Sequence, residues 1–164
     1  IKVYDERRVK ECFLKFIDNI DEKDLAKLTK SFYDERLSSI LYKDAVDMIK
    51  KLKNEGYMVI LISASPEFYI KEFYAIKEVD LIIGTKFAFE GGKFVRKMDG
   101  NNCKGEEKVK RLNEVLKEKN IKADFKNSYM FSDSLSDKPL LDLVGNPYLI
   151  NYKKHHEIEI LKWK

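Results

Sequence analysis

The sequence contains few of the residues that define specialised classes of protein. Its 164 residues include 2 cysteines, 3 prolines and 7 glycines. The low glycine and proline contents exclude collagen-like and low-complexity chains. Cys12 and Cys103 are too few for a disulfide framework and lack the CxxC spacing of zinc and redox sites, so we expect a reducing, cytoplasmic setting. What remains is one globular domain, with at most a small appendage.

Long apolar runs and a strong charge of one sign are also absent. The longest strongly apolar run, Met58–Ile62, is far shorter than the roughly 18 residues that cross a bilayer. The 32 Lys and Arg against 28 Asp and Glu give a net charge of only +4, and the basic residues alternate with acids. A nucleic-acid binder would show a basic stripe instead. We therefore expect neither a membrane nor a nucleic-acid partner, and the oligomeric state stays open.

The first part of the chain has apolar residues at helical spacing. Two stripes are visible, Val9, Phe13, Phe16, Ile17 and Ile20, followed by Leu25, Leu28, Phe32 and Leu37. This pattern predicts a helical region over residues 1–43. A further amphipathic helix is expected over 44–54, ended by Gly56 as a left-handed cap.

From Met58 onward, short apolar segments alternate with helical patterns. Strands are predicted at 58–62, 81–84, 128–131 and 148–151, helices at 66–76, 105–119 and 138–144, and a hairpin at 87–95 around Gly91 and Gly92. Strands that alternate with helices form βαβ units, so we predict an α/β fold with a parallel sheet.

Residues that could bind a ligand or take part in catalysis follow two of these strands. Ligands of an open parallel sheet bind beyond the carboxyl ends of its strands. There, Ser63-Ala64-Ser65 offers a hydroxyl and backbone N–H groups to an anion. Asp133 and Asp137 are oxygen ligands of the kind that Mg²⁺ shares with phosphate. Between them in sequence, Lys104 or Lys108 brings a cation that could hold phosphoryl charge.

Each of these residues also has a purely structural interpretation. The serines can cap a helix, the acids can be a cap and a solvated first-turn residue, and the lysines can face solvent. Their joint occurrence, in this order and each after a strand end, favours chemistry over these separate alternatives.

Four segments together are similar to one known family. They are Ile62–Tyr69, Cys103–Val109, Phe131–Leu141 and Val144–Pro147. They resemble the haloacid dehalogenase superfamily, most closely its phosphoserine-phosphatase-like branch, from about Tyr42 to the C-terminus. The resemblance implies a Rossmann-like, three-layer parallel-sheet core over 44–164 with a small helical cap over 1–43. It also implies an Mg²⁺-dependent phosphatase of a small phosphorylated metabolite, with phosphoserine as the leading candidate and an aspartyl-phosphate intermediate.

The resemblance assigns roles to individual residues. The Ser63 hydroxyl and the Ala64 N–H would hold a phosphoryl oxygen. Asp133 would bind the metal, and Asp137 would be its partner, orienting metal-bound water or the lysine.

The third-motif lysine has two candidates. Lys104 keeps the Lys-Gly-Glu order of phosphoserine phosphatases, whereas Lys108 keeps the Gly-x-x-Lys-Val order of the wider branch. We slightly prefer Lys108, because it lies one turn before Leu112 on the inward face of the predicted helix.

The family's first motif, an apolar strand ending in Asp-x-Asp with a following Thr, is not found in this sequence. Asp5 ends an apolar segment, but Glu6-Arg7-Arg8 follows where the second acid and the Thr should be. We therefore favour residues 4–8 as the approach to the first helix, and a role of Asp5 as the nucleophile is the less favoured alternative. We expect the motif's strand, which in the family lies beside the strands ending in Ser63 and Ser132, upstream of residue 1.

A chain of this family that lacks the nucleophile has a second possible function. It could be a non-catalytic module that binds a phosphorylated ligand or a partner. A receiver-type phospho-switch fits less well, because its acid pair follows the first strand.

Overall fold

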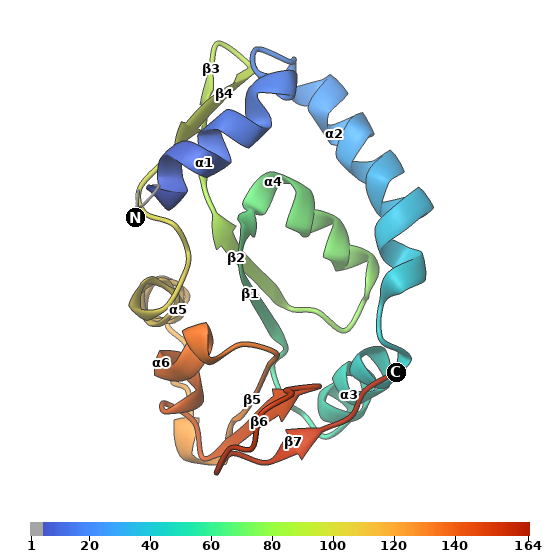
Figure 1. Ribbon diagram of the computed structural model, residues 1–164, viewed down its shortest axis with the longest axis vertical. Coiled ribbons are helices and arrows are strands. Elements are labelled where there is room, and N and C mark those ends of the chain that lie inside the picture. Colours follow the sequence, from blue (N-terminus) through green and yellow to red (C-terminus); the bar gives the residue numbers. More distant parts are fainter. Residues whose placement is uncertain (1–4) are drawn as a thin grey trace. The chain divides into compact units, whose positions relative to one another are not determined.

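The computed structural model describes residues 5–164, so the predicted segment at residues 1–4 lies outside the described residues (Figure 1). The chain divides into two compact units. The first combines the chain up to Leu41 with Ile49–Cys103, and the second combines Tyr42–Met48 with Lys104–Lys164. The proposed division into a cap over 1–43 and a core over 44–164 stays a prediction.

The first unit begins with two helices, α1 (Glu6–Phe13) and α2 (Glu22–Phe32). Asp5 caps α1, because its carboxylate accepts a hydrogen bond from the Arg7 N–H at 3.0 Å. The predicted helical character of this region is confirmed. A π-helical turn, Tyr33–Leu37, follows α2.

The two predicted apolar stripes are only partly covered. Ile17 and Leu25 are buried, whereas the Phe13 and Phe16 side chains are 77% and 80% exposed. Periodicity identifies the apolar face of a helix, but it does not say whether another element covers that face. The first stripe therefore predicts more buried residues than the structure has.

The buried face of the second helix differs from the predicted stripe. Tyr33 is buried because it lies four and eight residues after Thr29 and Leu25, which are also buried. Its ring packs edge-on against Phe73 at 5.4 Å between centroids. Phe32 stays 45% exposed.

A parallel pair of strands forms the centre of the first unit. In this pair, β1 (Ile60–Pro66) lies beside β2 (Leu81–Thr85), and α4 (Glu67–Ile70) follows β1 directly. The strand predicted at 58–62 thus starts two residues later and continues to Pro66. Pro66 caps α4 rather than occupying its first turn, and α4 ends at Ile70, where a 3₁₀ turn, Lys71–Ala75, takes over.

The register of the β1–β2 pair is interrupted at the candidate phosphate loop. Ile62 pairs with Ile83 and Pro66 with Thr85, so Ser63, Ala64 and Ser65 stand opposite the single residue Gly84. These three residues form a bulge, which frees backbone groups from the ladder. Gly84 lets α4 approach, because a Cβ there would lie 2.8 Å from the Glu67 Cα.

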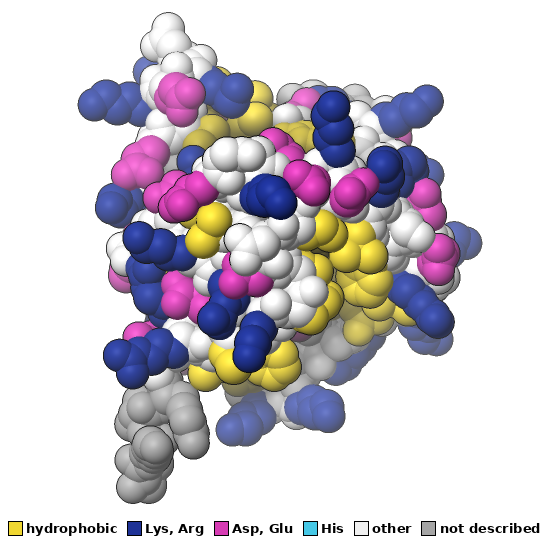
Figure 2. Space-filling view, turned by 90° about the horizontal axis from the view of Figure 1, so that it is seen from above, with side chains coloured by type: hydrophobic (Ala, Val, Ile, Leu, Met, Phe, Trp, Pro, Cys, Tyr) yellow, Lys and Arg dark blue, Asp and Glu magenta, His cyan; other side chains and the backbone are white. Residues whose placement is uncertain are grey.

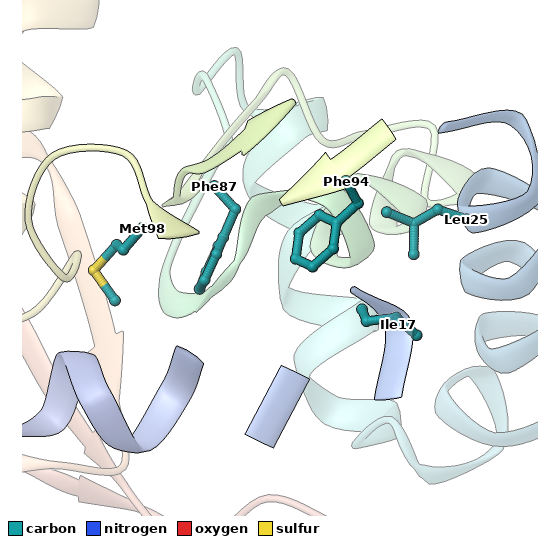
Figure 3. Packing of buried hydrophobic residues seen from close by; sticks show 5 residues of the cluster. All are labelled: Ile17, Leu25, Phe87, Phe94 and Met98. Carbon is teal, nitrogen blue, oxygen red and sulfur yellow. The ribbon is translucent and has the colours of Figure 1, made fainter. Parts of the chain in front are cut away.

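The predicted hairpin is confirmed and contributes most of one hydrophobic cluster. Strands β3 (Phe87–Glu90) and β4 (Lys93–Met98) are antiparallel, and Gly91 and Gly92 take positive φ in the turn. Figure 3 shows the cluster, in which the hairpin side chains face those from the N-terminal helical region; its members are Ile17, Leu25, Phe87, Phe94 and Met98. The helical region therefore packs on the hairpin.

The second unit contains a three-stranded parallel sheet. Its strands are β5 (Tyr129–Ser132), β6 (Asn146–Ile150) and β7 (Ile160–Leu161), in that order. Ser132 pairs with Leu149, so the carboxyl ends of β5 and β6 meet at one edge. The two-residue strand β7 was not predicted.

Three helices contribute to this unit. α5 (Glu106–Glu118) follows Gly105 as predicted, and α6 (Lys138–Leu141) is shorter than the predicted 138–144. The helix α3 (Lys43–Asn54) begins here and ends before Gly56, whose φ is 88°.

The fold is thus the Rossmann-like α/β type that the sequence predicts. Within residues 5–164, no helix is both long and apolar enough to cross a membrane. Figure 2 shows acidic and basic side chains interspersed over the face in view, with hydrophobic patches between them. This matches the alternation of charges in the sequence.

Candidate active site

The predicted phosphate loop is the bulge in β1, where a serine hydroxyl and a lysine from α1 lie close to the backbone. Ser63 Oγ accepts a hydrogen bond from the Ser65 N–H at 3.1 Å. The Ala64 carbonyl accepts from Thr85 Oγ1 at 2.7 Å and from Lys10 Nζ at 2.5 Å. Lys10 therefore places positive charge beside a loop that the sequence predicts to bind an anion.

Sequence reasoning missed both residues that hold this loop. Thr85 is fully buried and its hydroxyl also accepts from the Cys103 N–H at 3.1 Å, which fixes the carboxyl end of β2. Its place at a strand end was a signal that could have found it. Lys10 lies 54 residues before Ala64, and no local pattern connects the two.

A buried ion pair joins two predicted residues in the second unit. Lys108 Nζ lies 2.6 Å from Asp137 Oδ1, and the two side chains are only 7% and 11% exposed. The other Asp137 oxygen accepts from Ser132 Oγ at 2.8 Å. Lys104, in contrast, is exposed in the loop before α5. The geometry favours Lys108 as the phosphoryl-binding lysine, with Asp137 holding it, and both roles stay predictions.

The loop after β5 is fixed by short-range hydrogen bonds. Ser132 Oγ accepts from the Ser134 N–H at 3.1 Å, and Ser134 Oγ accepts from the Ser136 N–H at 3.2 Å. These bonds shape the single 3₁₀ turn Leu135–Asp137. The result is that Asp137 is buried while Asp133 is exposed. Ser132 directly follows the strand predicted at 128–131, but the sequence predicted no role for it in the site.

Asp133, the predicted metal ligand, lies beside a cavity. Its side chain lines a cavity of about 460 Å³ at the carboxyl ends of β5 and β6. No group of three or more His, Cys, Asp or Glu side chains gathers as a metal site within residues 5–164. Mg²⁺ needs only one or two carboxylates when phosphate and water complete its shell, so the donor set fits. Since both oxygens of Asp137 have partners, Asp133 is the better placed ligand of the two.

The candidate residues fall into both units. Lys108, Asp137 and Asp133 belong to the second unit, whereas Ser63 and Ala64 belong to the first. The convergence of the two groups on one phosphate stays a prediction.

Two curated relatives have similar sequences. Protein CicA of Caulobacter vibrioides is 33% identical over 88 residues, covering 53% of this chain and 40% of its own. A histidinol-phosphatase of Neisseria meningitidis is 26% identical over 147 residues, covering 86% of this chain and 66% of its own. The chain thus spans less than two thirds of the length of these relatives.

Solved structures share the fold. A protein of unknown function from Bordetella pertussis superposes with a TM-score of 0.83 at 25% identity, over 92% of this chain and 68% of that chain. Phosphoserine phosphatases superpose with TM-scores between 0.57 and 0.67 at 12 to 19% identity. The family model of the haloacid dehalogenase-like hydrolases matches residues 1–142, and the chain belongs to that family.

Proposed function

We propose that this chain forms part of an Mg²⁺-dependent phosphatase that hydrolyses small phosphomonoesters through an aspartyl-phosphate intermediate. The observation that carries the proposal is the buried Lys108–Asp137 pair, which follows from two separate predicted motifs. A relative named for phosphatase activity supports it. Phosphoserine is the leading substrate, and the name of the histidinol-phosphatase relative supports other small phosphate esters as alternatives.

Different residues of the chain would bind the phosphoryl group and stabilise its charge. Ser63 and Ala64 would hold one phosphoryl oxygen through the hydroxyl and the backbone N–H. Lys108, fixed by Asp137, would present its ammonium to the charge that develops during transfer. Bound Mg²⁺, held by Asp133 with Asp137 beside it, would neutralise phosphoryl charge as a Lewis acid.

The nucleophile does not come from Asp5 in this proposal. Asp5 caps α1, and Glu6, Arg7 and Arg8 are already helical. We propose instead an Asp-x-Asp segment outside the 164 residues. Its strand would find a free edge, since within residues 5–164 β1 pairs only with β2, and β5 only with β6.

The same observation on Asp5 supports a second candidate function. A chain with the phosphate and metal residues but no nucleophile could be a non-catalytic module that binds a phosphorylated ligand or a partner.

The two functions predict different results in a hydrolysis assay. We expect no Mg²⁺-dependent hydrolysis of an aryl phosphate by the 164 residues alone, because electrostatic stabilisation needs a nucleophile to act on. We expect turnover when an upstream Asp-x-Asp-x-Thr segment is added. Continued inactivity of the extended protein, with phosphate binding intact, would favour the module. Turnover by the 164 residues that is lost in Asp5→Asn would identify Asp5 as the nucleophile.

The role of Ser63 can be separated from its local hydrogen bond to Ser65. In the extended protein, Ser63→Ala should lower turnover by more than about tenfold, or about 1.4 kcal/mol in the transition state. A role limited to shaping the turn predicts a stability loss of about 1 kcal/mol and normal turnover. Paired kinetics and urea melts distinguish the two. Ser39→Ala, which removes an exposed hydroxyl bonded to the Arg36 carbonyl, serves as the control.

A further inference from the structure

The cavity beside Asp133 has a second wall that the proposed reaction does not use. Its lining combines Tyr42 and Asp133 with the five consecutive residues that end β6 and follow it, Ile150, Asn151, Tyr152, Lys153 and Lys154. All of these residues belong to the second unit. The cavity therefore lies where ligands of a parallel sheet bind, next to a candidate metal acid.

The wall formed by residues 150–154 has an anchored backbone. Asn151 adopts a left-handed conformation, with φ of 51°. Its side chain accepts from the Trp163 N–H and donates to the Trp163 carbonyl, both at 3.0 Å. Its own N–H donates to the Leu161 carbonyl at 2.9 Å. The chain that carries Lys153 and Lys154 thus leaves the sheet from a fixed point.

The positive charges of this wall are not neutralised by acidic side chains among the described residues. Lys153 and Lys154 are exposed, and neither forms an ion pair in the part of the chain that the structure describes. Two lysines line the cavity, and Asp133 is the one acidic residue in its lining. A lysine pair of this kind attracts a compact anion.

We infer that this cavity receives a second anionic group, a carboxylate or a phosphate, on the leaving-group side of the substrate. The inference rests on the proposed function, because Asp133 places the cavity beside the reaction centre. It narrows the substrate class to phosphomonoesters that carry a further negative charge. Lys153 and Lys154 are the residues that select them.

Matched esters test the inference by binding. Isothermal titration of the chain in Mg²⁺ would compare 3-phosphoglycerate with glycerol 3-phosphate, which replaces the carboxylate by a neutral hydroxymethyl group. We expect Lys153→Gln/Lys154→Gln to weaken 3-phosphoglycerate about tenfold and glycerol 3-phosphate less than about twofold. The monophosphate and bisphosphate of 1,3-propanediol form a second pair, which shows whether the second anion is a carboxylate or a phosphate.

Two control variants complete the design. Lys153→Arg/Lys154→Arg keeps the charge and should retain the preference. Lys117→Gln/Lys119→Gln makes the same charge change at exposed positions outside the cavity and should leave both affinities unchanged. Equal weakening of both esters, or no weakening of 3-phosphoglycerate, would overturn the inference while leaving the proposed phosphatase in place. If the unmodified chain binds neither ester, the proposed phosphate site formed by Ser63, Ala64 and Lys108 is contradicted as well.

Discussion

Replacing Lys108 by methionine is expected to destabilise the chain by about 3–5 kcal/mol, because it leaves the buried Asp137 carboxylate without its cation. The two groups are 2.6 Å apart and almost fully buried. The double variant Lys108→Met/Asp137→Asn should recover most of this loss, since it removes both charges together. Urea melts followed by circular dichroism measure both effects.

Lys104→Met is the matched control for this prediction. Lys104 is exposed, so its replacement should change stability by no more than about 0.5 kcal/mol. A loss at Lys104 as large as that at Lys108 would contradict the placement of the stabilising ion pair at Lys108. The comparison thus tests which of the two lysines Asp137 holds.

Asp133→Asn is expected to abolish turnover of the extended protein while leaving the fold intact. The amide is the same size as the carboxylate but lacks its charge, and Mg²⁺ prefers anionic oxygen ligands. The side chain is exposed in its cavity, so little packing is lost. Isothermal titration should show an Mg²⁺ affinity at least about tenfold weaker, a loss of about 1.4 kcal/mol.

Asp142→Asn makes the same change outside the site. Asp142 is exposed at the end of α6 and pairs with Lys138 at 2.5 Å, so its variant should keep normal Mg²⁺ affinity. Unchanged Mg²⁺ affinity in Asp133→Asn would remove Asp133 from the metal site.

The sequence was informative wherever structure depends on neighbouring residues. The hairpin follows from the positive φ of Gly91 and Gly92, a conformation that other residues rarely adopt. The helix after Gly105 follows from the helical spacing of Val109, Leu112 and Leu116. The loop after β5 is likewise built from bonds between residues two or five positions apart, such as that from Ser132 to Asp137. The acids of that loop were identified from the sequence by their place after a predicted strand and by the family resemblance.

Features that depend on distant contacts were not predictable. The bulge at Ser63–Ser65 depends on how β1 pairs with β2, and the strand prediction could not locate it. The exposure of Phe16 depends on which element covers the helix, and β7 is too short to show a periodicity. The link from Lys10 to Ala64 and the shared cavity of Asp133 and Lys154 arise only from folding.

Trp163, the only tryptophan of the sequence, has a consequence for studying how the chain unfolds. Its ring packs on Phe131 at 5.3 Å between centroids, and its backbone holds Asn151, so its environment is that of the second unit. Intrinsic fluorescence excited at the indole therefore reports on that unit alone, while far-ultraviolet circular dichroism averages over both. Coincident transitions would show that the two units lose structure as one cooperative system, and separate transitions would resolve the stability of each.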